Sequence, residues 1–526
     1  MFSMLRTQLF ADPTHRFLHD VILDSRHRFA AKVALVDTSC NRRLTYAEYG
    51  NAVESLAHGF VAAGLCPGDI IAIFLPNSWE FAIAYHAATM AGGVPTLLNP
   101  TYREREVHYQ LENSGAAFLI TDAAFIKDVS LSGLPSLRRV YTTRIAAPNT
   151  EPFADLLRPS NTPLPKPSRP SEETLAALPY SSGTTGLPKG VMLSHHNIVA
   201  NVYQTLGPNA APLVPDDVML CFLPLYHIYG LTVGLSLTLT LGATLVLMPR
   251  FDLARLCALL VEEGVTMMPM VPPAIAALCQ AAEAGRFPKQ SRLVWIKSGA
   301  APLAPELARH FRELTGVIVN QGYGMTEASP VTHVGFNAPP EMNRPASIGQ
   351  PLALTECRVL DLNDKEVPSG EPGELVMRGP QFMMGYWKDP QATAAVLRDG
   401  WYYSGDIVRT DADNFFYVLD RRKEMIKYKG FPVAPAEVEA VLMEHPAVRD
   451  CGVVPKRDPS AGEIPYAFVV LRPEYAPSES LARQLRDFVA DRLTHYKQPR
   501  EIQFVTAVPR TPSGKILRRE LRQALA

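Results

Sequence analysis

Residues 33–75 read VALVDTSCNRRLTYAEYGNAVESLAHGFVAAGLCPGDIIAIFL, and the fold class follows from the pattern within them. The two ends, VALV at 33–36 and IIAIFL at 70–75, are short apolar runs that are typical of buried strands. Between them, Thr45–Gly64 carries apolar residues at helical spacing and ends at a glycine, the residue that commonly follows a helix. A strand, a helix and a second strand in this order predict parallel strands covered by helices.

The same alternation continues along the chain. We predict a helix over 79–90, a strand over 95–98, a helix over 105–113 and a strand over 117–121. Residues 158–171, RPSNTPLPKPSRPS, are polar and rich in proline, as in a linker or an exposed loop. The alternation then resumes and runs to about Gly324, and residues 357–419 favour strands.

These patterns predict an α/β protein with more than one structural unit. A chain of 526 residues is too long for one ordinary hydrophobic core. We expect a large N-terminal domain at 1–419, with helix-covered, mostly parallel sheets and a β-rich subdomain. A hinge at 420–423 would then lead to a small, mobile α+β C-terminal domain at 424–526.

Composition excludes several classes of protein. The chain has 51 Lys and Arg against 52 Asp and Glu, a balance that argues against a nucleic-acid binder. Its seven cysteines are scattered without a C-x-x-C pair, so a disulfide scaffold or zinc site is not expected and a reducing compartment is favoured. The N-terminus lacks the apolar core of a signal peptide, so we expect a cytoplasmic protein. As a separate expectation, the protein is either a monomer or a homodimer.

The apolar stretch Leu231–Met248 is long enough to suggest a membrane span. Gly242 divides it into a helix-like half and a strand-like half that ends before Pro249. We therefore predict a buried helix followed by a core strand, and no membrane span.

The segment Tyr180–Gly190, YSSGTTGLPKG, carries the sharpest chemical signal. It follows the apolar run at 175–178 and precedes a helix-like stretch. Glycines let a backbone approach a ligand closely, and N–H groups with Ser and Thr hydroxyls can hold phosphate oxygens, to which Lys189 adds a cation. No G-K-[ST] stands where the Walker pattern requires it. A flexible surface loop is the alternative interpretation of this segment alone.

Six further segments accompany this one in order along the chain: LPLYHIYG (223–230), KSGAAPL (297–303), QGYGMTE (321–327), YSGD (403–406), DRRKEMIKYKGFPVAPAEVE (420–439) and PRTPSGKILRR (509–519). Together the seven resemble the adenylate-forming superfamily of acyl- and aryl-CoA ligases, luciferases and peptide-synthetase adenylation domains. The resemblance is closest to 4-coumarate:CoA ligase-like and fatty-acyl-CoA ligases. It implies that ATP activates a small carboxylic acid as an acyl-adenylate and that coenzyme A then accepts the acyl group.

Residue chemistry and the resemblance together assign a nucleotide site. Tyr323 can stack on adenine, and Thr326 and Glu327 can hold a Mg²⁺ that bridges the phosphates. Asp406, in a turn between strand-like segments, can accept the ribose hydroxyls, although an isolated Asp in a turn is usually turn chemistry. The resemblance adds Thr185 as a second metal ligand. It places the following residues around ATP or AMP: Ser181, Ser182, Gly183, Thr184, Thr185, Lys189, Ala300, Ala301, Gln321, Gly322, Tyr323, Gly324, Thr326, Asp406, Arg421 and Lys423.

The resemblance also assigns catalytic and coenzyme A residues. Adenylation needs a mobile cation beside the carboxylate and the α-phosphate, and the family gives this role to Lys515. Lys427 resembles the lysine of the second half-reaction, and Lys423 stands at the hinge, where a domain rotation is absorbed. The predicted catalytic residues are Lys515, His227, Lys427, Thr326 and Glu327. The predicted coenzyme A contacts are Arg250, Lys429 and Gly430.

The acid itself is not defined by the sequence. The resemblance implies an acyl pocket lined by His227, Tyr229, Val233, Lys297, Ala300, Gly322, Gly324 and Val331. Tyr229 and Lys297 suit an aromatic or oxygenated acid, and a medium-to-long-chain fatty acid fits nearly as well. Three alternatives stay open: an amide synthetase, a luciferase-like oxygenase and a non-enzymatic binding protein. One departure is Pro432, where relatives carry Gln, because proline lacks both the backbone donor and the amide.

Overall fold

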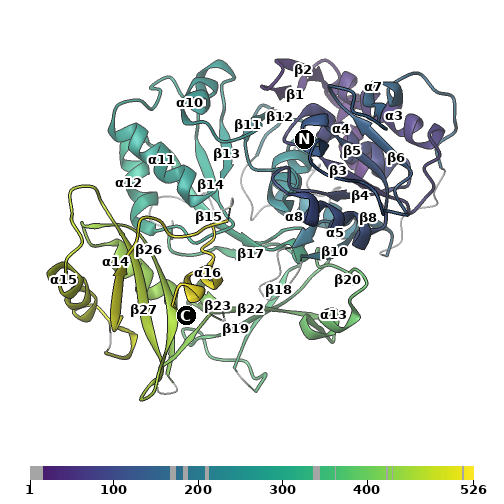
Figure 1. Ribbon diagram of the computed structural model, residues 1–526. Coiled ribbons are helices and arrows are strands. Elements are labelled where there is room, and N and C mark those ends of the chain that lie inside the picture. Colours follow the sequence, from purple (N-terminus) through teal and green to yellow (C-terminus); the bar gives the residue numbers. More distant parts are fainter. Residues whose placement is uncertain are drawn as a thin grey trace.

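The computed structural model describes residues 16–165, 173–181, 188–207, 213–335, 344–361, 363–421, 424–428, 431–493, 495–511 and 514–525. The side chains at positions 421, 427, 431 and 432 lie outside this description. Two helix-covered sheets dominate the large part of the molecule, and a smaller unit at the C-terminal end of the chain lies beside them (Figure 1). The predicted α/β class, with parallel sheets and a β-rich subdomain, is confirmed.

The larger sheet has nine strands and is mostly parallel. In spatial order its strands are β17 (Gln350–Pro351), β16 (Val331–Val334), β15 (Ile318–Gly324), β14 (Trp295–Ser298), β13 (Met267–Met270), β11 (Val218–Cys221), β12 (Thr244–Leu247), β1 (Val33–Asp37) and β2 (Arg42–Thr45). Neighbours from β15 to β1 run parallel, whereas β2, β16 and β17 pair antiparallel. Helices α10 (Leu253–Glu262), α11 (Pro272–Glu283) and α12 (Pro305–Thr315) connect the central strands.

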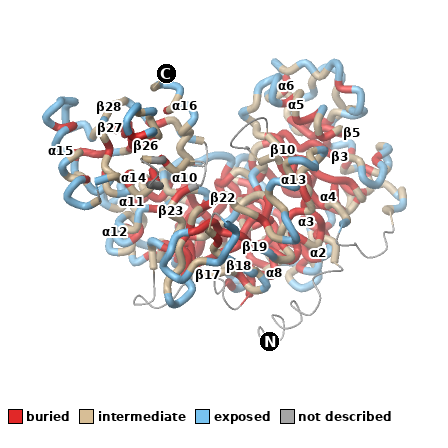
Figure 2. The backbone as a smooth tube through the Cα atoms, turned by 90° about the horizontal axis from the view of Figure 1, so that it is seen from below, coloured by how far each residue is buried: buried red, intermediate tan, exposed pale blue. Residues whose placement is uncertain are grey.

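The second sheet is parallel throughout. Its order is β4 (Val94–Leu97), β3 (Ile70–Phe74), β5 (Ala116–Thr121), β6 (Arg139–Thr142) and β7 (Glu151–Pro152). Helix α4 (Trp79–Met90) packs against β3 and β4 on one side and against β1 of the nine-stranded sheet on the other. Almost every residue of α4 is therefore buried, which explains why its sequence is apolar on all sides. Figure 2 shows this continuous buried region in red.

Local chemistry accounts for the helix bounds. Helix α3 (Tyr46–Ala62) begins where Thr45 and Glu48 form a reciprocal capping box, and the chain turns at Gly64 with φ of 90°. Ser78 caps α4 with a single hydrogen bond, which its hydroxyl accepts from the N–H of Phe81. The remaining helices of the large part are α2 (Leu18–Arg28), α5 (Glu104–Ser114), α6 (Ala123–Ile126), α7 (Phe153–Leu156), α8 (His195–Thr205) and α13 (Pro390–Val396).

The apolar stretch that resembled a membrane span is a buried helix followed by a strand, as predicted. It forms the π-helix η2 (Tyr229–Ser236), the helix α9 (Leu237–Leu241) and then β12. Gly242 turns the chain between them with φ of 86°. Across the described part of the chain, no helix has both the length and the apolar character needed to cross a bilayer.

Smaller sheets join the large ones. Strands β8 (Leu175–Ala177), β9 (Tyr180–Ser181), β10 (Lys189–Ser194) and β20 (Gly385–Tyr386) form one. The β-rich subdomain contains β18 (Glu356–Leu360), β19 (Gly373–Arg378), β21 (Leu397–Arg398), β22 (Trp401–Thr410) and β23 (Phe416–Arg421).

Sheet membership changes after β23. The next strand belongs to a separate sheet of β25 (Phe431–Val433), β24 (Ile426–Tyr428), β27 (Gly462–Leu471), β26 (Val448–Asp458) and β28 (Glu501–Phe504). Helices α14 (Pro435–Met443), α15 (Glu479–Ala490) and α16 (Arg518–Gln523) cover it, and it has its own apolar core. The carboxylate of Asp420 accepts a 2.8 Å hydrogen bond from the N–H of Ala436, which joins the end of β23 to the start of α14. The hinge at 420–423 stays a prediction.

Candidate active site

The carboxyl ends of β13, β14 and β15 meet at one edge of the nine-stranded sheet. Lys297 of β14 lies opposite Asn320 of β15, and Ser298 lies opposite Gln321. This register brings the segments KSGAAPL and QGYGMTE together, since each begins within the last residues of its strand and continues beyond the strand end. In open parallel sheets, ligands bind at the carboxyl edge. The edge therefore defines a candidate site for small molecules.

Tyr229 and the π-helix that it begins close one side of this edge. The hydroxyl of Tyr229 donates a 2.9 Å hydrogen bond to the backbone carbonyl of Lys297. A Cβ at Gly299 would lie 2.9 Å from the Tyr229 ring, so a larger residue there would displace the ring. Val233 packs against the small apolar cluster that contains Val331. These predicted acyl-pocket residues thus lie along one wall, on a helix type that is frequent at functional sites.

Lys297 is a buried amine in this wall. Its side chain lies over the Trp295 ring, and Nζ donates a 2.5 Å hydrogen bond to the carbonyl of Gly335. Burial lowers the pKa of Lys297 to about 7, because desolvation disfavours the ammonium form. The amine therefore changes its protonation near neutral pH, and its contact with a bound acid stays a prediction.

On the other side of the edge, Tyr323 contacts Asp406. The Tyr323 hydroxyl donates a hydrogen bond to Oδ2 of Asp406, and the Tyr323 ring packs edge to face on His333. Asp406 is buried, and its N–H donates a 3.1 Å hydrogen bond to the hydroxyl of Ser404. The ring predicted for adenine and the carboxylate predicted for ribose are thus in contact, although they come from different sheets.

The side chain of Gln321 supports the neighbouring turn. Its amide oxygen accepts a 2.9 Å hydrogen bond from the N–H of Leu303, and its amide nitrogen donates at 2.8 Å to the carbonyl of Pro345. Ala300 has a left-handed φ of 68° and is exposed, and Ala301 is half-buried. The turn therefore presents backbone toward the site.

Glu327 is a buried carboxylate with features that suit a metal ion. Tyr386 donates a 2.8 Å hydrogen bond to Oε1 of Glu327, and among the described residues Glu327 forms no ion pair. Thr326 begins the short helix η3 (Thr326–Ala328), and its side chain is half-buried beside Glu327. An oxygen donor with a buried negative charge is the ligand that Mg²⁺ prefers, so these residues fit that ion.

Lys189 reaches the same region from β10. Its Nζ lies 3.2 Å from Oδ2 of Asp389 and 5.2 Å from the centre of the Tyr386 ring. Ser181 of β9 pairs with Lys189, so the two ends of the predicted phosphate loop are held together as a hairpin. Ser182, Gly183, Thr184 and Thr185 lie outside the described residues.

Two sequence expectations about local structure are wrong. Asp406 does not lie in a turn but inside the ten-residue strand β22. Gly405 takes a left-handed φ of 71° and the register with β23 shifts between Ile407 and Val408, so a bend within the strand gives the turn-like pattern. The phosphate loop is not followed directly by a helix, because β10 precedes α8.

The glycines of QGYGMTE belong to β15 rather than to a segment that follows it. Gly322 pairs with Val334 and Gly324 pairs with Val331 of β16. A Cβ at Gly324 would lie 2.1 Å from the carbonyl oxygen of Pro330, so the close approach of the two strands requires glycine.

Of the other predicted site residues, some are exposed and some lie outside the described part of the chain. His227 is exposed and desolvation by protein atoms lowers its pKa, and its role beside the acid stays a prediction. Arg250 is exposed just beyond β12. The side chains of Arg421 and Lys427 lie outside the description, as do Lys423, Lys429 and Gly430, so their roles stay predictions.

Lys515 is half-buried and follows Gly514. A Cβ at Gly514 would lie 2.9 Å from the ring of Pro273, in the first turn of α11. Helix α11 directly follows β13, so the Lys515 segment of the C-terminal unit lies against the carboxyl edge of the nine-stranded sheet.

Sequence reasoning missed Tyr386 and Asp389. Both residues follow strand β19 of the β-rich subdomain by several positions. Tyr386 lies in β20, which pairs antiparallel with β10, and this pairing places Tyr386 and Asp389 near the candidate site. The segment GYWKDP in which they lie holds an aromatic hydroxyl and an acid, which is a weak signal without the contact to Lys189 and Glu327.

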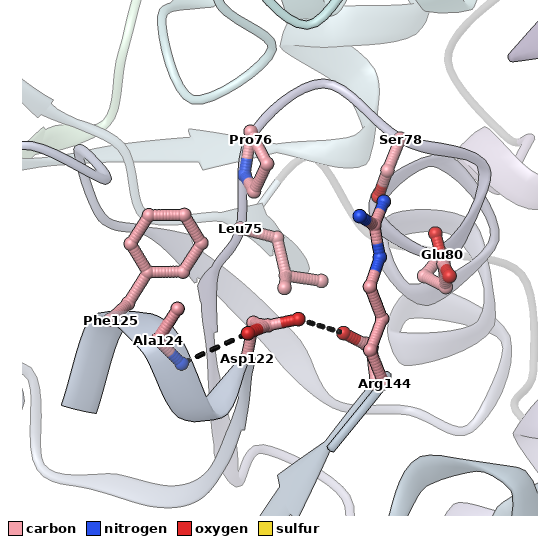
Figure 3. A pocket seen from close by; sticks show the side chains of 9 residues that line it. Leu75, Pro76, Ser78, Glu80, Asp122, Ala124, Phe125 and Arg144 are labelled. Carbon is pink, nitrogen blue, oxygen red and sulfur yellow. Dashed lines mark hydrogen bonds between the residues drawn. The ribbon is translucent and has the colours of Figure 1, made fainter. Parts of the chain in front are cut away.

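A cavity of about 160 Å³ lies elsewhere, at the carboxyl ends of β3, β5 and β6. Figure 3 shows Arg144 and Glu80 on one side and Phe125 on the other. Asp122 accepts a 2.9 Å hydrogen bond from the N–H of Ala124. None of the sequence-predicted site residues lines this cavity.

The fold, with candidate side chains gathered at the carboxyl edge of a parallel sheet, suits an enzyme that binds small molecules at this edge. Residues 24–387 match the family described as AMP-binding enzyme, and residues 437–515 match the AMP-binding enzyme C-terminal domain. The chain belongs to the AMP-binding enzyme family. The resemblance to adenylate-forming enzymes is thereby confirmed.

Named relatives are similar over nearly the whole chain. It is 38% identical over 524 residues to 4-coumarate–CoA ligase 5 of Oryza sativa subsp. japonica, covering 98% of this chain and 96% of the relative. It is 37% identical over 521 residues to 4-coumarate:CoA ligase 1 of Petunia hybrida, covering 98% and 95%. The predicted class, an AMP-forming acid–thiol ligase, agrees with these relatives.

Solved structures give the same result. An anthranilate CoA ligase in complex with anthranoyl-AMP has a TM-score of 0.88 at 28% identity, with 98% of each chain covered. A benzoate CoA ligase from Burkholderia xenovorans has a TM-score of 0.86 at 27% identity, covering 96% of this chain and 100% of that one.

Proposed function

We propose that this AMP-binding enzyme is an acid:CoA ligase. It would use ATP to convert an aryl acid, or a medium-to-long-chain fatty acid, into an acyl-adenylate with release of pyrophosphate. Coenzyme A would then accept the acyl group, with release of AMP. The supporting observation is that β14 and β15 end side by side, so that the buried amine of Lys297 and the Tyr323–Asp406 pair share one edge.

This edge suits the first half-reaction because it holds two molecules next to each other. Tyr323 and Asp406 offer a ring and a carboxylate to a nucleoside, while Tyr229 and Lys297 line the neighbouring wall. Positioning of the two reactants supplies much of the acceleration in such a transfer. Lys515, on the segment that contacts α11, would neutralise charge on the carboxylate and the α-phosphate.

Glu327, with Thr326 beside it and Tyr386 orienting it, would hold the Mg²⁺. When bound, that ion supplies charge neutralisation at the phosphate oxygens. The relatives and structural neighbours named as 4-coumarate, anthranilate and benzoate CoA ligases support an aromatic acid as the first choice. A polar ring substituent would suit the amine of Lys297.

The test is exchange of labelled pyrophosphate into ATP over a panel of hydroxycinnamic, benzoic and fatty acids. We expect acid-dependent exchange with at least one of them, and acyl-CoA formation with that acid when coenzyme A is added. Absence of exchange with every acid would exclude the proposed function. AMP formation that is independent of coenzyme A but stimulated by an amine would instead favour an amide synthetase, and light emission with a luciferin would favour a luciferase-like oxygenase.

A further inference from the structure

The segment that carries Lys515 is folded back on itself. The N–H of Thr511 donates to the carbonyl of Lys515 at 2.8 Å, and the N–H of Lys515 donates to the hydroxyl of Thr511 at 3.1 Å. Arg510 and Ile516 form a bridge just outside this pair. The backbone of Lys515 is therefore set by its neighbours within the segment rather than by a helix or a long strand.

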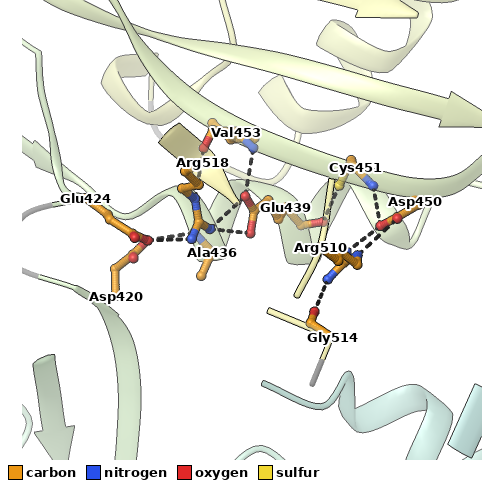
Figure 4. Close-up of polar contacts among 10 residues, drawn as sticks. All are labelled: Asp420, Glu424, Ala436, Glu439, Asp450, Cys451, Val453, Arg510, Gly514 and Arg518. Atoms are coloured by element: carbon orange, nitrogen blue, oxygen red, sulfur yellow. Dashed lines mark hydrogen bonds and ion pairs between the residues drawn. The ribbon is translucent and has the colours of Figure 1, made fainter. Parts of the chain in front are cut away.

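Arg510 fastens this segment to the sheet of the C-terminal unit. Its guanidinium binds both carboxylate oxygens of Asp450 in β26, at 2.6 Å from Nη2 and 3.2 Å from Nε. Its remaining Nη1 donates a 2.7 Å hydrogen bond to the carbonyl of Gly514, the residue before Lys515 (Figure 4). A planar guanidinium can make this two-sided contact, whereas a lysine ammonium cannot reproduce the fork.

Asp450 is itself held in place. Its Oδ1 also accepts a 2.9 Å hydrogen bond from the N–H of Cys451, which is buried in β26. The contacts thus run from the rigid strand β26 to Asp450, to Arg510 and to the Gly514 carbonyl. On the far side of the segment, Gly514 has a left-handed φ of 85° and approaches Pro273 of the large part so closely that a Cβ would not fit.

We propose that Arg510 is a positioning residue for Lys515, oriented by Asp450, and that it is required for adenylation but not for transfer to coenzyme A. This inference rests on the proposed function. The guanidinium fixes the direction of the Gly514 carbonyl and with it the path of the chain into Lys515. The contact with Pro273 joins this path to the large part at the carboxyl edge, where adenylation takes place.

A purely structural role is the alternative, and burial argues against it. The side chains of Arg510 and Asp450 are 31% and 29% exposed, and ion pairs with this much exposure contribute little to stability. Arg518 provides a contrast in the same unit. It is 10% exposed and binds Glu424 and Glu439, so it holds the C-terminal unit together (Figure 4). Arg510 instead joins Asp450 of β26 to the backbone carbonyl of Gly514, the residue before Lys515.

The experiment separates the two half-reactions. For Arg510→Gln we expect the rate of ATP–pyrophosphate exchange to fall about 10- to 100-fold, the loss expected when a catalytic group is displaced by about 1 Å. Acyl transfer from a supplied acyl-adenylate to coenzyme A should change less than about threefold, since it does not need Lys515 in place. Asp450→Asn should give a smaller loss of the same kind, and Arg510→Lys should fall between Arg510→Gln and the wild type.

The matched control removes another exposed ion pair on β26. Lys456 contacts Glu501 at 2.7 Å, far from the Lys515 segment, so Lys456→Gln should leave both half-reactions unchanged. Equal loss of both half-reactions in Arg510→Gln, or a lowered midpoint of thermal unfolding, would show a structural role and overturn the inference. Unchanged exchange in Arg510→Gln, alongside a strong loss in Lys515→Ala, would also overturn it. Absence of exchange in the wild type would refute the proposed function itself, a result distinct from both.

Discussion

The candidate site is assembled from two regions that differ in how firmly they hold their side chains. At the edge of the nine-stranded sheet, the side chains of Lys297 and Gln321 are buried and held by backbone partners, and that of Glu327, just beyond β15, is buried and held by the hydroxyl of Tyr386. In the C-terminal unit, Lys515 lies on a segment held by hydrogen bonds to Thr511, by the partly exposed ion pair of Arg510 with Asp450, and by the close approach of Gly514 to α11. Under the proposed function, the first region would keep a nucleotide and an acid in place, and the second would be withdrawn after adenylation.

The difference between the sheet edge and the Lys515 segment indicates which contacts must be rigid in the proposed adenylation. Groups that orient the two reactants gain from burial, because precise geometry and a low dielectric both strengthen their effect. Lys515 is a cation that the proposed reaction needs in only one half-reaction. A weakly held segment suits it, because the segment can then leave the site before the other half-reaction. If this comparison is right, substitutions in the Lys515 segment affect adenylation alone. Substitutions at the sheet edge instead affect the binding of one reactant, either the magnesium nucleotide or the acid.

The largest effect is expected from Lys515→Ala. Loss of the positive charge that Lys515 would bring to the reacting atoms should lower acid-dependent ATP–pyrophosphate exchange by about 10²- to 10³-fold, as for other preorganised electrostatic groups. Acyl transfer from a supplied acyl-adenylate should be nearly unchanged. Arg519→Ala removes a neighbouring exposed cation and serves as the control. A similar loss in both steps would contradict the division between the two regions.

A smaller effect is expected from Glu327→Gln. The amide keeps the shape and a hydrogen-bonding group for Tyr386 but removes the charge that fits Mg²⁺. We expect a loss of about 10- to 100-fold in exchange at limiting Mg²⁺, in the range seen when a carboxylate that orients or binds a metal is changed. Titration with MgCl₂ should restore part of the activity. The control is Glu356→Gln, in an exposed pair with Arg378, and an unchanged Mg²⁺ dependence in Glu327→Gln would refute the metal role.

Much of this arrangement could be predicted from the sequence, for a physical reason. Short apolar runs alternating with helical periodicity along the chain predicted the fold class. The two strand-like runs of residues 33–75, however, lie in different sheets, because β1 pairs antiparallel with β2 in the nine-stranded sheet and β3 belongs to the second sheet. The residues after β14 and β15 could be placed at one edge because parallel strands end together. Helix α4 could be predicted as a helix, but its burial between two sheets depends on the tertiary structure.

Contacts between distant segments could not be predicted in this way. Tyr386 meets Glu327 only because β20 pairs with β10, and Asp450 meets Arg510 across the C-terminal sheet. Asp406 was misplaced because a glycine bend inside a strand produces the same local pattern as a turn. Residue type and spacing do not indicate which distant strands pair. A single sequence therefore predicts the individual strands, helices and motifs, but not which of them contact one another.

The smallest effect concerns Lys297 and tests the rigid region directly. Methionine has a similar volume and no charge, and replacing a buried charge by an apolar residue is often stabilising. We expect Lys297→Met to raise the free energy of unfolding at pH 7 by about 1–3 kcal/mol, measured by urea denaturation. It should also lower discrimination between a ring-hydroxylated acid and its deoxy analogue by about tenfold, because the buried donor is lost.

The pH dependence shows whether burial of the amine is the cause. The folded pKa of Lys297 is about 7, well below the ordinary lysine value of 10.5, so between these values the unfolded chain binds more protons and wild-type stability rises with pH. The advantage of Lys297→Met should therefore be full below pH 7 and shrink as the pH approaches 10.5. Lys388→Met, at an exposed lysine, should show no such trend. A constant difference across this range would mean that the amine is not desolvated, and the rigid region would then lack the buried donor assigned to it.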